Sequence, residues 1–206
     1  MHHQLTRPID TVIFDLGNVL IKWDPRTLYR KIFVDPGAME YFLSEICTPE
    51  WNLKQDAGRS WEAGITDRIQ AFPEYESEIR AYRERWVEML GGAMEESVYM
   101  LKSLYTAGDF RLLALTNWSA ETWPIALERF DFLQLFEGIV VSGQEGMVKP
   151  DQEIYQLICD RYHIDPARAL FIDDSEANVI GAQKFGLNAI QFESPGQFRQ
   201  ALANWL

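Results

Sequence analysis

Five short apolar segments set the strongest constraint on how this chain folds. They cover residues 11–16 (TVIFDL), 111–116 (RLLALT), 138–142 (GIVVS), 169–174 (ALFIDD) and 187–192 (LNAIQF). Each is rich in Val, Ile, Leu or Phe and does not alternate, which is typical of parallel strands covered on both faces. Segments with apolar residues at helical spacing lie between the last four of these five runs. This order predicts an α/β protein with a doubly wound, Rossmann-like parallel sheet.

The segments between these strands predict helices, because their apolar residues recur at helical spacing. The expected helices cover residues 95–107, 121–136, 151–163 and 175–185. Gly108, Pro166 and Gly186 stand where three of these helices should stop.

Residues 21–93 interrupt the alternation. They contain no convincing strand, are rich in aromatic residues, and suggest helices at 26–33, 37–46, 60–71 and 74–90. A loop of that length is implausible in a compact domain. We therefore predict a helical module at 21–93, entered near Lys22 and left near the Gly91–Gly92 pair, which suits a hinge. Residues 1–20 and 94–206 then form the α/β core.

Charge and composition exclude several classes of partner. The net charge of −12 repels the phosphate backbone of nucleic acids. No apolar run is long enough for a membrane span, and the first residues lack the apolar core of a signal peptide. His2 and His3 are given no metal role. Cys47 and Cys159 lie in no metal spacing and predict free thiols in the cytoplasm. A monomer and a homodimer are both compatible with the sequence.

Polar side chains follow four of the predicted strands. They are Asp15 with Gly17 and Asn18, Thr116 with Asn117, Lys149, and Asp173 with Asp174 and Asn178. The carboxyl ends of parallel strands meet at one sheet edge, where ligands bind. One Asp at a strand end usually forms a turn or cap. Three carboxylates raise one another's pKa unless a cation compensates them, and Mg²⁺ prefers such oxygen ligands.

Four motifs carry a resemblance to a known family. FDLGNVL at the first strand, LTN ending at Asn117, VKPD around Lys149 and FIDDSEAN ending at Asn178 resemble, in order and placement, the motifs of the haloacid dehalogenase superfamily. The helical insert resembles that superfamily's first cap type. The DLGN form with the acidic pair most resembles its glucose-1-phosphate phosphatase-like branch.

The resemblance implies a hydrolase with Asp15 as the nucleophile, forming a covalent aspartyl intermediate. Thr116 would hydrogen-bond the transferring group, with Asn117 beside it, and Lys149 would neutralise Asp15 and the substrate. The implied substrate is a small phosphorylated metabolite, a sugar phosphate in particular.

The resemblance also implies an Mg²⁺ site. Asp15, the backbone carbonyl of Gly17 and Asp174 would bind the ion, and Asp173 would bind it directly or through water. Asn178 would orient its neighbours.

Gly17 departs from the phosphatase pattern, which usually has a second Asp there to protonate the leaving group and activate water. A water, Asp24 or Asp56 replaces it, or the leaving group departs easily, as in a sugar 1-phosphate. Alternatively the reaction is dehalogenation, in which a halide leaves without a proton. Dehalogenases typically lack the acidic pair, so Asp173 and Asp174 favour a phosphatase. A non-catalytic binding protein of the same fold is a further alternative.

The cap sequence at 50–65 is polar enough to line a closed site. We expect Arg59 to lie near the substrate. Trp118 either walls the pocket or packs against the base of the cap.

Overall fold

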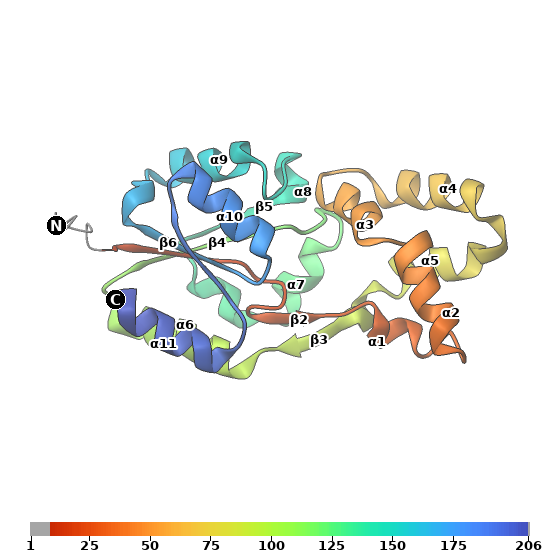
Figure 1. Ribbon diagram of the computed structural model, residues 1–206, viewed down its shortest axis with the longest axis horizontal. Coiled ribbons are helices and arrows are strands. Elements are labelled where there is room, and N and C mark those ends of the chain that lie inside the picture. The colour runs from red at the N-terminus through yellow and green to blue at the C-terminus, as the bar shows by residue number, and fades with distance from the viewer. Residues whose placement is uncertain (1–8, 206) are drawn as a thin grey trace.

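A five-stranded parallel sheet forms the centre of the protein (Figure 1). The structure, a computed structural model, describes residues 9–205. The strand order is β5-β4-β1-β6-β7. The strands are β1 (Thr11–Phe14), β4 (Arg111–Thr116), β5 (Gly138–Val141), β6 (Ala169–Asp173) and β7 (Asn188–Gln191). The five predicted strands are present, and the predicted doubly wound fold is confirmed.

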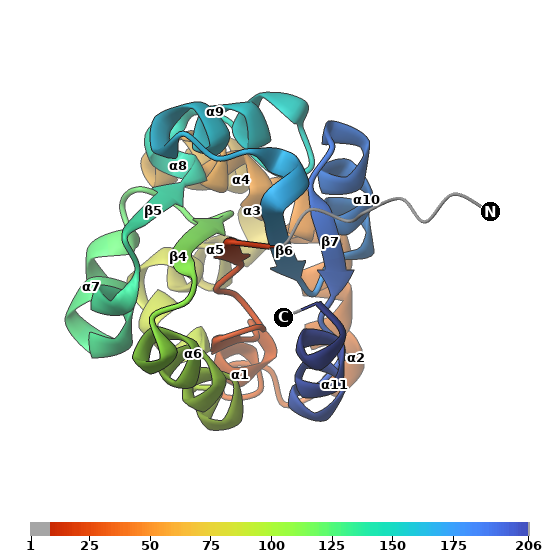
Figure 2. The ribbon, with the colours of Figure 1, turned by 90° about the vertical axis from the view of Figure 1, so that its left-hand side faces the viewer.

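Both faces of this sheet are buried, which explains the continuous apolar runs. Val12 and Phe14 belong to one hydrophobic cluster, and Ile13 between them belongs to the other. The helices α6 (Glu95–Ala107) and α11 (Pro195–Trp205) cover the first face, and α9 (Gln152–Tyr162) and α10 (Glu176–Phe185) cover the second (Figure 2). The side chains at the carboxyl edge of the sheet therefore extend from a well-packed scaffold.

Two glycines end helices as predicted. Gly108 follows α6 with φ of 73° and Gly186 follows α10 with φ of 112°, left-handed conformations that favour glycine. Helix α9 ends at Tyr162, within one residue of the predicted bound, and His163 follows it in the left-handed position with φ of 52°. Pro166 begins the next short turn instead of stopping α9.

Other core helices differ from the sequence pattern. The segment expected as one helix at 121–136 divides into α7 (Trp123–Arg129) and a 3-10 turn at Asp131–Leu135. Helix α11 and the short helix α8 (Ser142–Glu145) were not anticipated.

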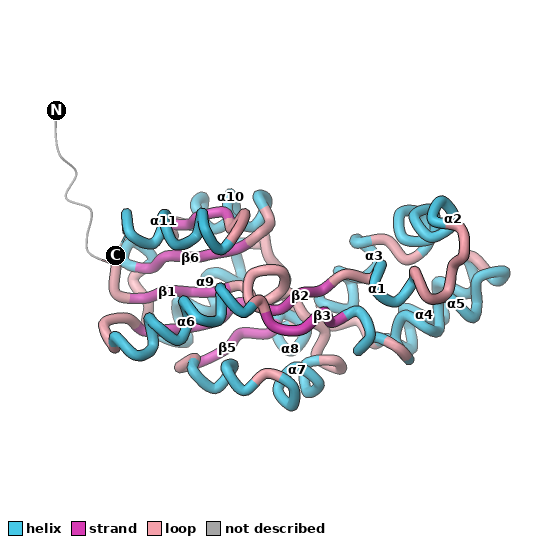
Figure 3. Tube along the Cα trace, turned by 90° about the horizontal axis from the view of Figure 1, so that it is seen from below, coloured by secondary structure: helices cyan, strands magenta, loops and turns pink. Residues whose placement is uncertain are grey.

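The cap lies beyond the carboxyl end of the sheet, between β2 (Ile21–Trp23) and β3 (Leu90–Ala93) (Figure 3). The expectation of no strand within 21–93 is wrong at both ends, because β2 and β3 pair antiparallel. These strands are very short, and the Gly91–Gly92 pair gives β3 little β propensity. The cap helices are α1 (Arg26–Tyr29), α2 (Pro36–Tyr41), α3 (Pro49–Asp56), α4 (Trp61–Ala71) and α5 (Glu76–Glu84).

The cap helices only partly follow the predicted segments. Helix α4 matches its segment, whereas α1 covers only the first half of 26–33. A π-helical turn at Phe42–Ile46 completes the segment begun by α2. Helix α3 was missed, because its buried side chains are only Trp51 and Gln55.

Direct hydrogen bonds hold the cap against the core. The Trp61 indole N–H donates to Ser119 Oγ at 3.0 Å, and its backbone N–H donates to Glu121 at 2.9 Å. The Ser142 hydroxyl donates to the backbone carbonyl of Asp56. These contacts fix the end of α3 over the carboxyl edge of the sheet.

Cys47 and Cys159 are buried free thiols, as predicted. Within residues 9–205, no helix combines the length and the apolar character needed to cross a bilayer. His2 and His3 lie outside the described residues.

Candidate active site

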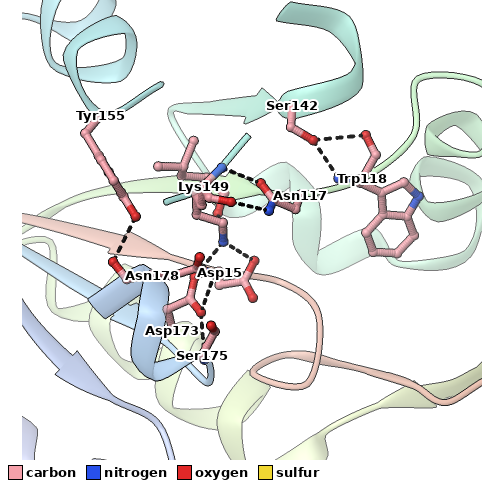
Figure 4. A network of polar contacts seen from close by, with 10 residues as sticks. Asp15, Asn117, Trp118, Ser142, Lys149, Tyr155, Asp173, Ser175 and Asn178 are labelled. Carbon is pink, nitrogen blue, oxygen red and sulfur yellow. Dashed lines mark hydrogen bonds and ion pairs between the residues drawn. The ribbon is translucent and has the colours of Figure 1, made fainter. Parts of the chain in front are cut away.

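Asp15 lies directly beyond β1, in the middle of the sheet. Its backbone N–H donates to the Ile172 carbonyl of β6 at 2.8 Å, which continues the pairing between the two strands. The side chain is buried, and it faces Lys149 and Asp173 (Figure 4). The sheet thus holds the proposed nucleophile rigidly.

Lys149 lies between two carboxylates. Its Nζ lies 2.8 Å from Asp15 Oδ1 and 2.6 Å from Asp173 Oδ2, and it donates to the Leu115 carbonyl at 2.9 Å. An ammonium has three protons, so these three contacts use all of them. With these three contacts in place, Lys149 has no proton left for a further acceptor and can affect a nearby anion only through its charge.

Asp173 is saturated with protein donors. Asn178 donates to both of its oxygens, at 3.0 and 3.1 Å, and the Ser175 backbone N–H donates to Oδ1 at 2.9 Å. With Lys149 on Oδ2, both oxygens accept twice. Tyr155 in turn donates to the Asn178 carbonyl at 2.8 Å. This network positions Lys149 and occupies the lone pairs that a metal would need.

Asp15, Asp173 and Asp174 bring one carboxylate oxygen each within 4.8 Å of one another. Lys149 compensates one of the three negative charges and leaves an excess of two. Carboxylate oxygens in this number are suitable ligands for a hard divalent cation. The cluster can hold a metal, with Asp15 and Asp174 less engaged by protein donors than Asp173.

The electrostatics of the cluster are consistent with a cation site. Burial raises the pKa of Asp15 to about 7, against the lowering effect of Lys149, and Asp173 adds repulsion. Burial and Asp173 raise the pKa of Asp174 too. Burial alone would lower the pKa of Lys149, but the charges of Asp15 and Asp173 raise it above its ordinary value. A cation beside the carboxylates would lower their pKa again.

Thr116 and Asn117 follow β4 as predicted. Thr116 is buried at the end of the strand. Asn117 uses both amide atoms on the backbone of Lys149: Nδ2 donates to its carbonyl at 3.0 Å and Oδ1 accepts from its N–H at 2.9 Å. Asn117 therefore positions the loop that carries Lys149.

A cavity of about 90 Å³ opens between cap and core. Its lining includes Gly17, Asn117 and Trp118 of the core and Trp23, Asn52, Asp56 and Trp86 of the cap and its entry strand. The Trp118 ring also packs against the Trp86 ring in a tilted arrangement, with centroids 5.5 Å apart. Both alternatives for Trp118 are therefore correct, because it walls the cavity and packs against the cap.

Arg59 does not belong to the lining of this cavity among the described residues. Its guanidinium donates to Gln55 Oε1 at 2.6 Å and lies 3.5 Å from Asp67. These contacts organise the cap, so we leave Arg59 out of the proposed substrate site.

Gly17 lines the cavity, and its backbone is not left-handed. Within the described part of the chain, a Cβ at this position would meet no heavy atom within 4 Å. Neither strain nor crowding therefore explains the missing acid.

Asn52 and Asp56, from the polar cap segment expected to line a closed site, do line the cavity. Sequence reasoning missed Trp23 and Trp86. They come from β2 and the turn before β3, and nothing in their local sequence distinguishes them from cap core residues. Asn18, at φ of 53°, was noticed only as a neighbour of Asp15; its side chain accepts from the Trp23 N–H at 3.1 Å and hydrogen-bonds Asp174.

Fold and site together define an α/β protein with a buried carboxylate, Asp15, at the carboxyl edge of its central strand. The family model for haloacid dehalogenase-like hydrolases matches residues 9–186. The chain belongs to this family of hydrolases, as its motifs predicted.

Relatives in the family catalyse different reactions. A sesquiterpene phosphatase from Aspergillus oryzae is 26% identical, over 85% of each chain. An (S)-2-haloacid dehalogenase from Pseudomonas is 27% identical, over 89% of this chain and 84% of the relative. A HAD family enzyme from Bacteroides thetaiotaomicron, solved with magnesium and inorganic phosphate, shares the fold with a TM-score of 0.67 and 24% identity, over 90% and 94% of the two chains.

Proposed function

We propose that this protein is a cytoplasmic, Mg²⁺-dependent phosphatase that hydrolyses a small phosphate monoester through a phosphorylated Asp15. The observation that carries the proposal is the excess of negative charge where three carboxylates share the Lys149 ammonium. Such an excess suits a divalent cation, which would in turn attract an anionic phosphoryl group, whereas halide displacement needs no cation. The magnesium and phosphate complex of the Bacteroides enzyme supports this choice of metal.

Each residue has a defined part in the proposed reaction. The Asp15 carboxylate attacks phosphorus, and the bond from phosphorus to the ester oxygen breaks. Water then attacks the phosphorus of the aspartyl phosphate, which releases inorganic phosphate and restores the carboxylate. Thr116 hydrogen-bonds the transferring group, and Lys149 compensates the charge of Asp15 and of the phosphoryl oxygens.

Asp15, Asp174 and the Gly17 carbonyl are the ligands that we propose for the metal. Asp173 already accepts from Lys149, Asn178 and Ser175, so its proposed role is to hold Lys149. When bound, Mg²⁺ would stabilise the charge on the phosphoryl oxygens.

The cavity favours a small leaving group with both apolar and polar surface. Its volume of about 90 Å³ is far below that of pockets for drug-sized ligands. Trp23, Trp86 and Trp118 offer apolar faces, and Asn52 and Asp56 offer hydrogen bonds. A sugar phosphate combines these properties, whereas a long isoprenoid chain does not.

The test is phosphate release from 4-nitrophenyl phosphate with Mg²⁺ and with a chelator, on the wild type and Asp15→Asn. We expect release that the chelator abolishes and that the variant lacks. Hexose 1-phosphates and farnesyl phosphate then compare the two kinds of leaving group. No release by the wild type with Mg²⁺ would reject the proposal. Phosphate binding without turnover would then favour a binding protein.

Dehalogenation is the second candidate, because Gly17 provides no acid and a halide needs none. The Pseudomonas relative supports it. Halide release from a 2-halopropionate, unaffected by chelator, would establish this activity.

A further inference from the structure

The missing acid at Gly17 raises the question of which group protonates the leaving oxygen. Asp56 is the only carboxyl among the described residues that line the cavity, and Gly17 lines the same cavity. Asp24, the other candidate from the sequence, is 43% exposed, and its carboxylate accepts from the Arg26 N–H at 2.9 Å. Of the two candidates, therefore, only Asp56 lines the cavity among the described residues.

We propose that Asp56 of the cap is the general acid and base of the reaction, in place of the acid absent at Gly17. This inference rests on the proposed phosphatase function. It makes the cap a part of the catalytic machinery, since the proton donor is in place only when α3 lies on the core.

Contacts with both cap and core hold Asp56 in position. Asn52, one helical turn earlier, donates to Asp56 Oδ2 at 2.9 Å. The Ser142 hydroxyl, directly after β5, donates to the Asp56 backbone carbonyl. The backbone N–H of Trp118 donates to the same hydroxyl at 2.9 Å. Asp56 is thus anchored to the loop beside Asn117, which also holds Lys149.

The environment raises the pKa of the Asp56 carboxyl to about 7, near neutral pH. Asp56 is the last residue of α3, where the partial negative charge of the helix end opposes ionisation. Burial raises the pKa of Asp56 to about 7, against the lowering effect of a hydrogen bond with the Ser119 backbone. A group that changes protonation near the working pH serves as both acid and base.

Asp56 transfers one proton in each of the two steps of the proposed reaction. As Asp15 attacks phosphorus and the ester bond breaks, the Asp56 carboxyl gives its proton to the departing oxygen, which leaves as an alcohol. In the second step the Asp56 carboxylate takes a proton from the water that attacks the aspartyl phosphate. Phosphate leaves, the Asp15 carboxylate is restored, and Asp56 is protonated again.

The leaving group decides how much the acid matters. A 4-nitrophenolate departs easily without a proton, whereas a sugar alkoxide does not. We would therefore follow formation of the Asp15 intermediate by acid quench, in single turnover with Mg²⁺, for 4-nitrophenyl phosphate and glucose 6-phosphate. Asp56→Asn should slow formation of the intermediate about 100-fold or more with the sugar phosphate and less than about tenfold with the aryl ester. With the aryl ester, Asp56→Asn should form the Asp15 intermediate and then accumulate it, because the water that hydrolyses the intermediate lacks its base.

A second variant tests rescue. Gly17 has room for a side chain beside the same cavity. The double variant Gly17→Asp/Asp56→Asn should therefore react with the sugar phosphate at least about tenfold faster than Asp56→Asn alone. A structural role for Asp56 would not produce this recovery. Glu50→Gln, an exposed acid on the same helix, is the matched control and should react as the wild type does. Asp56→Ser replaces Asp56→Asn if the latter does not fold.

An equal loss on both esters, no loss, or no recovery with Gly17→Asp would overturn the assignment of Asp56. Failure of the wild type on both esters with Mg²⁺ would instead reject the phosphatase function itself.

Discussion

The Lys149 ammonium lies 2.8 Å from Asp15 Oδ1, inside the core and beside a second carboxylate, Asp173. Replacing Lys149 with Met should remove activity and leave two buried carboxylates without a cation. Loss of one partner of a buried ion pair costs about 3–5 kcal/mol. Urea unfolding at pH 8 measures this loss, with Lys184→Met, an exposed lysine, as the control. Equal stability of Lys149→Met and wild type would show that the pair contributes nothing.

Asn178 should matter for both stability and activity, because it donates to both oxygens of Asp173. Asn178→Ala leaves a buried carboxylate short of donors and should cost about 1–3 kcal/mol. It should also lower kcat at least several-fold, because Asp173 positions Lys149. Asn188→Ala is a matched control, since Asn188 also makes two hydrogen bonds, to Ala167 and Ala169, far from the site. A similar loss of kcat in Asn188→Ala would argue against the positioning role.

Asp56 gives a prediction for the pH dependence of stability. Its pKa rises from 3.8 to about 7 on folding, so the folded state favours the protonated form. The stabilisation is complete below pH 3.8 and is lost as the pH rises through 7. Asp56→Asn should therefore be more stable than wild type at pH 8, by about 2 kcal/mol after allowance for solvent in the cavity. Thermal unfolding from pH 5 to 8 measures this, with Asp109→Asn, a substitution of an exposed acid, as the control. A destabilised Asp56→Asn at pH 8 contradicts the assigned environment.

Metal addition should stabilise the folded protein. Mg²⁺ at about 100 times its dissociation constant adds about 2.7 kcal/mol, seen as a rise in Tm. The rise should be larger at pH 8 than at pH 5.5, because the metal competes with protons for carboxylates of raised pKa. Asp174→Asn should lose the effect and the exposed control Asp109→Asn should keep it. A rise in Tm that is unchanged in Asp174→Asn would place the ion elsewhere.

The core of the fold was predictable because its signals are local. Each central strand is an unbroken apolar run, and Asp15, Thr116 and Asp173 stand at the carboxyl ends of such runs. Parallel pairing then brings them together, whatever the loops between them do. The resemblance to the family motifs added expected roles for these residues, such as nucleophile or metal ligand, which residue types alone left open.

The cap was less predictable because its contacts join distant residues. Asp56 is held by Ser142, 86 positions away, and no local pattern reports this bond. Helix α3 buries only two side chains, and β3 contains two glycines, so neither has a clear periodicity. Arg59 looked suited to a substrate by charge, but Gln55 and Asp67 engage it within the cap.

The most direct test of the account is a search for the phosphoryl group on Asp15. The wild type would be mixed with 4-nitrophenyl phosphate and Mg²⁺, quenched in acid within a single turnover, digested and examined by mass spectrometry. The account predicts a phosphoryl mass increment on the tryptic peptide that ends at Lys22, localised to Asp15 and absent in Asp15→Asn and after chelation. Turnover without any such increment, or with normal rates in Asp15→Asn, would contradict it.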